Sequence, residues 1–188
     1  MTHPEAVDFI RSAVDVAPGA AGAWADLGAG TGTFTRALAQ LLGAGGVVLA
    51  VDRDRRAVES LRGLAERSRD GARIEAVAGD LTAPGHIPAL EDVTLDGVLF
   101  GNSLHFLSRP ERALGWAGRR IVPGGRVVVI EYEREGASRW VPYPLPLRRL
   151  RTVLEAAGLP SPSVTARRPS AYHGEMYCAV ARVLPLAG

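Results

Sequence analysis

Three glycines alternate with small residues in the stretch Asp26-Leu27-Gly28-Ala29-Gly30-Thr31-Gly32, between a predicted strand and a predicted helix. Glycine lets a backbone turn tightly and approach a ligand without a Cβ in the way, and the helix start beyond offers unpaired N–H groups. The spacing is G-x-G-x-G, with Thr33 where a dinucleotide-binding turn has its third glycine. The pattern predicts a ligand-binding turn, for which an ordinary tight strand–helix turn is the alternative.

Two further carboxylates follow the next two predicted strands: Asp52 after residues 47–51, and Asp80 after residues 74–77. In a doubly wound sheet the position of Asp52 lies beside the glycine turn, where a carboxylate can accept from both hydroxyls of a ribose. Asp80 at the neighbouring strand end is placed to accept from an adenine amino group. Each aspartate by itself is also compatible with a solvated turn. Acids after three successive strands, together with the glycine turn, indicate a nucleoside site.

The elements that must position these residues alternate along the chain, which is typical of an α/β fold with a mostly parallel sheet. Apolar runs predict strands at residues 23–27, 47–51, 74–77, 95–100, 126–130, 164–167 and 175–183. Apolar residues at helical spacing predict helices at about 4–16, 34–42, 55–68, 108–121 and 147–157. Capping-box spacing occurs at Thr2/Glu5 and at Ser108/Glu111, and residues 123–125 are expected to separate a helix from a strand. The last two strands are close enough to form a hairpin, so the final strand should be antiparallel.

The composition narrows the function classes. The chain has 188 residues, 47% of them hydrophobic, which suits one globular domain. No apolar run reaches the length of a membrane span and no secretory signal is visible, so a cytoplasmic location is expected. All 22 basic residues are arginine, which excludes enzymes that need a lysine amine. With one cysteine and four scattered histidines, no metal site is expected.

The arginines form short clusters, such as Arg53/Arg55/Arg56 and Arg148/Arg149/Arg151, within a formal net charge of +2. One interpretation is a solvated surface in which arginine replaces lysine. The other is a nucleic-acid-binding face, because neutralising phosphates requires clustered cations. No aromatic residues interleave with the basic groups as a stacking platform would need, which favours the first interpretation.

The stretch Trp24–Gly32 resembles the first motif of class I S-adenosylmethionine-dependent methyltransferases. Val51-Asp52 resembles the ribose-binding acid of that family, and Ala78–Leu81 its adenine-side motif. Leu95–Asn102 is similar to the fourth-strand motif, and Val122–Arg126 to the loop before strand five. The resemblance extends over nearly the whole chain. It implies a single domain, residues 1–188, with an N-terminal helix within 1–18 and a substrate-side loop at 133–146.

The family fold implied by this resemblance is a Rossmann-like, doubly wound α/β sheet of seven strands in the order 3-2-1-4-5-7-6, with strand 7 antiparallel. The implied cofactor is S-adenosylmethionine, with S-adenosylhomocysteine as product. The implied cofactor-binding residues are Asp26, Gly28, Gly30, Gly32, Asp52, Arg53, Asp80, Leu81 and Asn102. In these roles the glycine turn faces the methionine part, with Asp26 near its amino group. Asp52 holds the ribose, Arg53, Asp80 and Leu81 surround the adenine, and Asn102 lies near the sulfonium.

Methyl transfer from a sulfonium is an in-line displacement, and it needs a general base only when the acceptor is bound in its protonated form. His105 is the candidate base because it follows the fourth strand at the ligand-binding end of the sheet and has a near-neutral intrinsic pKa. The alternative is a histidine that packs against the next helix. Glu131 and Tyr132, at the end of strand five, are the next candidates for this base. The substrate-side residues are expected to be Glu131, Trp140, Tyr143 and Tyr172.

Departures from family subtypes favour a small-molecule acceptor. The stretch Asn102-Ser103-Leu104-His105 lacks the proline pair typical of enzymes that methylate base amines in nucleic acid. Methylation of pyrimidines at carbon 5 needs a cysteine nucleophile, but Cys178 lies in a predicted terminal strand, far from the ligand-binding end of the sheet. Arsenite methylation needs several cysteines, and this chain has one. The alternatives left open are an RNA or protein methyltransferase using the arginine clusters and a catalytically silent binding scaffold. A nicotinamide oxidoreductase is disfavoured by the glycine spacing, and the sequence leaves the oligomeric state open.

Overall fold

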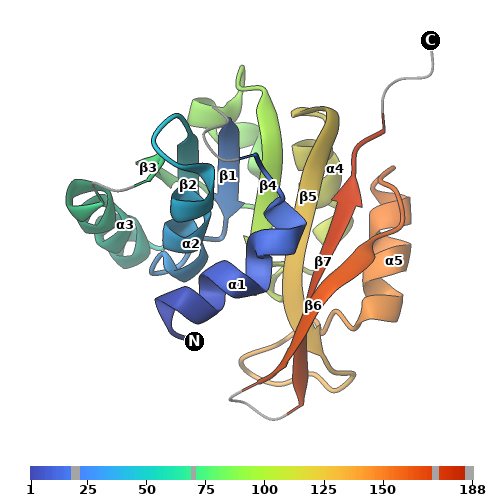
Figure 1. Cartoon of the computed structure of the whole chain (residues 1–188). Coiled ribbons are helices and arrows are strands. Elements are labelled where there is room, and N and C mark those ends of the chain that lie inside the picture. Colours follow the sequence, from blue (N-terminus) through green and yellow to red (C-terminus); the bar gives the residue numbers. More distant parts are fainter. Residues whose placement is uncertain (18–21, 69–70, 171–173, 185–188) are drawn as a thin grey trace.

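Seven strands form one sheet in the order β3-β2-β1-β4-β5-β7-β6 in the computed structural model, with helices on both faces (Figure 1). The structure describes residues 1–17, 22–68, 71–170 and 174–184. The strands are β1 (Ala23–Leu27), β2 (Val47–Asp52), β3 (Arg73–Ala78), β4 (Leu95–Gly101), β5 (Ile121–Glu133), β6 (Ser163–Pro169) and β7 (Glu175–Arg182). The helices are α1 (His3–Val14), α2 (Thr33–Leu42), α3 (Arg55–Arg67), α4 (Pro110–Gly118) and α5 (Leu147–Ala156), with 3₁₀ turns η1 (Pro84–His86), η2 (Pro88–Leu90) and η3 (Leu104–Phe106). The predicted strand order is confirmed.

Strand direction brings the carboxyl ends of the central strands to one edge of the sheet. β1 pairs in parallel with β2 and β4, β2 with β3, and β4 with β5. β7 runs antiparallel to both β5 and β6, as predicted. The carboxyl ends of β1 to β6 and the start of β7 therefore lie at the lower edge in Figure 1, where the first helix also begins. Ligands of open α/β sheets bind at this edge.

Alternating side chains of the buried strands build two apolar layers. Trp24, Val48 and Leu99 pack on one face with α1 and α2, whereas Ala25, Leu49 and Val98 pack on the other face with α4 and α5. Both layers are continuous because parallel strands covered on both faces are apolar throughout. The fold is thus the three-layer arrangement that the alternation of strands and helices predicts.

The first helix has the predicted capping box. The carboxylate of Glu5 accepts from the backbone N–H of Thr2 at 2.6 Å and from its hydroxyl at 3.0 Å. These bonds, together with Arg168 of β6, lower the pKa of Glu5 to about 2. The helix ends at Val14, two residues before the predicted end, because Asp15 takes a left-handed conformation with φ of 40°. The cap therefore fixes the position of the chain's first turn beside β6.

The prediction for residues 108–125 is wrong in two respects. The fourth helix begins at Pro110 with Arg109 as the N-cap, and no side chain caps it, so Ser108 and Glu111 form no capping box. Proline suits the first helical position because its φ is already helical and its missing N–H is not needed there. Residues 123–125 lie inside β5, where the pairing to β4 shifts register between Leu95 and Gly97. The register shift accommodates these residues as an irregularity within the strand.

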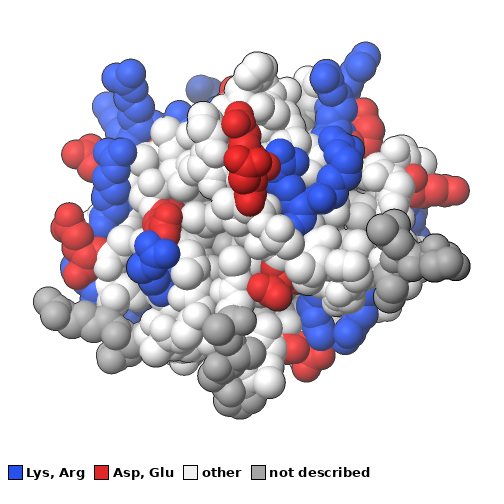
Figure 2. Space-filling view, turned by 90° about the horizontal axis from the view of Figure 1, so that it is seen from above, with Lys and Arg blue, Asp and Glu red and all other residues white. Residues whose placement is uncertain are grey.

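Arginines and acidic residues are interspersed on the surface seen from above in Figure 2. Asp15 pairs with both Arg126 and Arg182, and the pair of Arg148 and Glu135 raises the pKa of the guanidinium. Mixed charges of this kind are typical of a solvated surface. Within the described ranges, no helix has both the length and the apolar character needed to cross a membrane.

Candidate functional site

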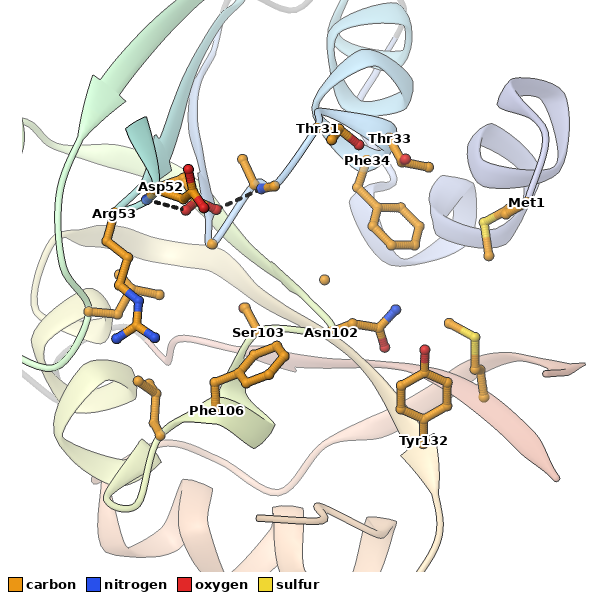
Figure 3. Close-up of a pocket in the computed structure, with 18 of the residues that line it drawn as sticks. Met1, Thr31, Thr33, Phe34, Asp52, Arg53, Asn102, Ser103, Phe106 and Tyr132 are labelled. Atoms are coloured by element: carbon orange, nitrogen blue, oxygen red, sulfur yellow. Dashed lines mark hydrogen bonds between the residues drawn. The ribbon is translucent and has the colours of Figure 1, made fainter. Parts of the chain in front are cut away.

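A pocket of about 560 Å³ opens at the carboxyl end of the sheet, between β1, β2, β4 and the end of β6. Figure 3 shows it from close by. The residues that line it are Met1, Gly28, Ala29, Gly30, Thr31, Thr33, Phe34, Asp52, Arg53, Asp54, Gly79, Asp80, Leu81, Gly101, Asn102, Ser103, Phe106, Leu107, Tyr132, Arg168, Pro169, Ser170 and Met176. The pocket thus collects seven of the nine predicted cofactor-binding residues, and Asp26 and Gly32 lie outside its lining.

The glycine turn forms one wall of the pocket. The backbone N–H groups of Gly28 and Ala29 both donate to the carbonyl of Val51 at 2.9 Å, which ties the turn to the end of β2. Gly28 has φ of 81°, and a Cβ there would lie 2.4 Å from the Cβ of Ser103. At Gly30, with φ of 55°, no atom lies within 4 Å of such a Cβ. Glycine is therefore required at position 28 because a side chain there would clash with Ser103, whereas at Gly30 the backbone is open towards the pocket.

Asp52 is held by two backbone amides at the end of β2. Its Oδ2 accepts from the N–H of Gly30 at 2.8 Å, and its Oδ1 accepts from the N–H of Asp54 at 2.9 Å (Figure 3). A carboxylate oxygen has two acceptor sites, so each oxygen retains one for a ligand. The carboxylate is oriented before any ligand binds, which is a suitable arrangement for a pair of neighbouring hydroxyls.

Asp80 and Arg53 lie near Asp52. The Oδ1 of Asp80 accepts from the N–H of Thr82 at 2.8 Å, and this bond, with the nearby charge of Arg53, lowers the pKa of Asp80. The next residue, Leu81, is 9% exposed and also lines the pocket. An ionised acceptor beside an apolar side chain and a guanidinium is suited to a flat heteroaromatic group that has an amino substituent.

Asp26 lies below the pocket and is only 1% exposed. Its Oδ2 accepts from the hydroxyl of Thr35 at 2.6 Å, and burial raises its pKa to about 7, with a smaller contribution from the charge of Asp52. Asp26 therefore ties the end of β1 to the first turn of α2. Gly32, with φ of 88°, is the N-cap of the same helix and packs on Leu61 and Leu64 of α3.

Asn102 and Ser103 follow β4 on the opposite wall. Asn102 has the unusual φ of 55°, and its buried Oδ1 has no hydrogen-bond partner among the described residues. The hydroxyl of Ser103 donates to the carbonyl of Leu27 at 2.7 Å, which joins this wall to the glycine turn. Asn and Asp tolerate a positive φ better than other side chains, so this strained residue beside a pocket points to a functional position.

His105 and Glu131 form a buried pair behind the pocket. His105 Nδ1 lies 2.7 Å from Glu131 Oε2, and the backbone N–H of His105 donates to Glu131 Oε1 at 3.1 Å. Exposed fractions are 2% for His105 and 0% for Glu131, and neither residue lines the pocket. The residues that follow them, Phe106 and Tyr132, do line it. The structure thus brings the two predicted residues together but places them one residue away from the pocket wall.

The predicted substrate-side aromatics lie outside the pocket lining. Trp140 is 74% exposed, and the ring of Tyr143 is on the surface while its N–H donates to the carbonyl of His105 at 3.0 Å. Tyr172 lies outside the described residues. Cys178 is buried in β7, where burial raises its pKa to about 11. The roles predicted for His105, Glu131, Trp140, Tyr143 and Tyr172 stay predictions.

Several lining residues have no counterpart among the predicted site residues: Met1, Phe34, Phe106, Arg168 and Met176. Phe34 belongs to the apolar face of α2, so its pattern indicated only a core position. The other four come from the chain start, η3, β6 and β7, which meet only in the folded sheet. The chain has two methionines, and both of them line the pocket, so the rarity of this residue type is the one feature of the sequence that these positions share.

Residues 25–129, more than half of the chain, match the family model of a methyltransferase domain. An uncharacterized methyltransferase of Mycobacterium tuberculosis is 30% identical over 173 residues, 88% of this chain and 60% of that protein. An uncharacterized protein of a Streptomyces fradiae transposon is 33% identical over 63% of this chain and 32% of its own length. The chain thus spans between a third and three-fifths of these relatives.

A solved structure of an arsenic(III) S-adenosylmethionine methyltransferase from Chlamydomonas reinhardtii shares the fold, with a TM-score of 0.74 and 18% identity. The match covers 97% of this chain and 74% of that one. The strand order, the glycine turn, the aspartate after β2 and the family match agree. This chain belongs to the class I S-adenosylmethionine-dependent methyltransferases.

Proposed function

We propose that the chain transfers a methyl group from S-adenosylmethionine to a nucleophile on a small, largely apolar molecule by in-line displacement. The observation that carries this proposal is one continuous pocket with two different ends. Asp52 and Arg53 lie at one end, with Asp80 close to Arg53, and Phe34 and Tyr132 lie at the other (Figure 3). Met176 pairs with Tyr132 across β5 and β7 and also lines the pocket. The first end suits a nucleoside and the second an apolar acceptor.

The residues of the first end fit the cofactor's nucleoside. Asp52 has one acceptor site left on each oxygen for the two ribose hydroxyls. Asp80 accepts from an adenine amino group, while Leu81 and Arg53 lie against the ring. The open backbone at Gly30 and the unpartnered Oδ1 of Asn102 provide room and an acceptor for the methionine part. These observations support the fit of the cofactor to this chain.

S-adenosylmethionine supplies an activated methyl group when it is bound. The remaining task of the protein is to hold the acceptor nucleophile in line at about 3 Å, and positioning of this kind can supply much of the rate enhancement. Phe106 and Tyr132 form apolar walls suited to a flat acceptor. His105 stays a prediction as a general base, and its burial against Glu131 supports a positioning role for the pair.

A labelled-methyl transfer screen tests the proposal. The chain is incubated with S-adenosylmethionine carrying a labelled methyl group and with a metabolite extract, an RNA pool or a protein pool in separate reactions. We expect label in an apolar small-molecule fraction that is lost in the Asp52→Ala variant. Label transferred to RNA or protein alone would replace the proposed acceptor class. The ion pairs of the surface arginines, such as Arg148 with Glu135, do not favour RNA as the acceptor.

A further inference from the structure

The acidic groups of the pocket lie at one end only. Among the described lining residues, the carboxylates belong to Asp52, Asp54 and Asp80, all of which follow β2 and β3. The other end, which we call the aromatic end, contains Phe34, Met1 and Tyr132 (Figure 3), together with Met176, the register partner of Tyr132 on β7. Arg168 of β6, the register partner of Met176, lies at this same end, and its guanidinium is paired with the carboxylate of Glu5 at 3.1 Å. A positive charge at the aromatic end must be stabilised by something other than a lining carboxylate.

Phe34 is held firmly in the wall of the aromatic end. Its side chain is 8% exposed and packs over Gly101 at the end of β4, where a Cβ would lie 2.4 Å from Phe34 Cδ2. The absence of a side chain at Gly101 therefore lets the ring lie directly on the strand. Figure 3 shows this ring above Asn102 and facing the space in front of Tyr132.

Tyr132 is positioned from the opposite wall by the buried pair. It follows Glu131 in β5, and its ring centroid lies 5.8 Å from that of His105 at an interplanar angle of 48°. Phe106 follows His105, and its ring centroid lies 4.3 Å from the same imidazole. The pair of His105 and Glu131 thus fixes aromatic residues that line the pocket from two strand ends.

Aromatic faces attract cations through the ring quadrupole, and the attraction strengthens when the site excludes water. S-adenosylmethionine has a positive charge at sulfur, which its product lacks. If Asp52 and Asp80 bind the nucleoside, the remainder of the cofactor extends along the same pocket towards the aromatic end. We propose that the aromatic end recognises the sulfonium charge, and that Phe34 contributes more to binding of the charged cofactor than to binding of its neutral product. This inference rests on the proposed use of S-adenosylmethionine.

Titration calorimetry on the full chain tests the inference with three ligands. S-adenosylmethionine and sinefungin have a positive charge at or next to the reacting position, whereas S-adenosylhomocysteine is neutral there. We expect Phe34→Leu to lower the affinity for the two charged ligands about five- to thirtyfold. The affinity for S-adenosylhomocysteine should stay close to that of the wild type. An equal loss for charged and neutral ligands would overturn the inference.

Two controls separate charge recognition from packing and from the nucleoside site. Phe100→Leu removes a fully buried ring of β4 on the other apolar layer, and it should not change the ratio of affinities for charged and neutral ligands. Asp52→Asn should weaken all three ligands alike. If the wild-type chain binds none of the three ligands, the proposed function itself fails, which is a different result from an equal loss of affinity for charged and neutral ligands in the Phe34→Leu variant.

Replacement of Phe34 by 4-cyanophenylalanine keeps the ring and withdraws electrons from its face, so the test does not depend on how well the leucine variant folds. We expect weaker binding of S-adenosylmethionine and unchanged binding of S-adenosylhomocysteine. If the cyano-substituted ring binds S-adenosylmethionine as tightly as phenylalanine does, the ring acts by shape alone and the inference is wrong.

Discussion

The strands of residues 23–80 and those of residues 95–182 contribute to the pocket in different ways. The first set, β1 to β3, contributes a glycine turn and carboxylates that backbone amides hold, such as Asp52 on Gly30 and Asp54. The second set, β4 to β7, contributes rings that a buried side-chain pair supports, with Tyr132 and Phe106 next to Glu131 and His105. Polar binding groups are oriented locally, whereas the apolar walls depend on contacts between distant segments.

The two sets of strands should therefore tolerate substitutions differently. A carboxylate held by main-chain amides keeps its orientation as long as the turn forms, so its loss affects binding more than folding. Rings supported by a buried pair lose their support when either partner is removed, so folding and acceptor binding change together. Substitutions in each set can separate effects on binding from effects on folding.

Asp52→Ala should have the largest effect on cofactor binding. It removes the proposed partner of two ribose hydroxyls, and hydrogen bonds to charged groups are worth about 1.5 to 3 kcal/mol each. We expect the affinity for S-adenosylhomocysteine to fall about a hundredfold or more, with little loss of unfolding free energy. Calorimetry and thermal unfolding measure the two quantities. Glu59→Ala, on the exposed side of α3, is the matched control and should bind normally.

His105→Ala should mainly destabilise the fold. Removal of the imidazole leaves the buried carboxyl of Glu131 without its side-chain partner, and an unsatisfied buried polar group costs about 1 to 3 kcal/mol. We expect a lower unfolding free energy and lower turnover, while the affinity for S-adenosylhomocysteine stays near normal because Asp52 is unaffected. Glu131→Gln, which keeps the shape of the side chain, should be milder. Stability close to wild type with lost turnover would instead support the predicted role of His105 as a base.

Asp26→Asn should change the pH dependence of stability. The pKa of Asp26 is raised from 3.8 to about 7 in the folded chain, so the folded state binds the extra proton between these values. Wild-type stability therefore falls as pH rises through this window, and the fall reaches on the order of 4 kcal/mol above pH 7. The asparagine variant lacks this component. Unfolding curves at pH 5 and pH 8 should show the difference between the two proteins shrinking or reversing at the higher pH.

Gly28→Ala tests the contact between the two sets of strands. The new Cβ would lie 2.4 Å from the Cβ of Ser103, at a φ that L side chains rarely adopt. We expect a loss of about 1 to 3 kcal/mol in unfolding free energy, together with weaker cofactor binding. Gly136→Ala, where nothing lies within 4 Å, should be close to neutral. Equal stability of the two variants would contradict the tight contact between Gly28 and Ser103.

The features of the fold that can be predicted from the sequence are those that depend on residues close together in the chain. The alternation of strands and helices, the capping box of Thr2 and Glu5, and the position of Asp52 after β2 all follow from residues close together in the chain. The prediction for residues 108–125 is wrong. A proline occupies the first position of the helix, and a register shift in the pairing to β4 keeps residues 123–125 within the strand, so the expected capping box and helix stop do not form. Caps are weak signals, and pairing to a neighbouring strand outweighs them.

From the amino-acid sequence alone one can predict the family, the order of elements and the carboxylates near the ends of three successive strands, because glycine turns and strand ends are set by short-range backbone geometry. The bond between Asp26 and Thr35 and the packing of Phe34 on Gly101 become visible only in the folded sheet. The tertiary structure also places the pair of His105 and Glu131 behind the pocket rather than in its lining. These contacts join residues from different strands and helices, and their energies come from burial that no single segment can provide.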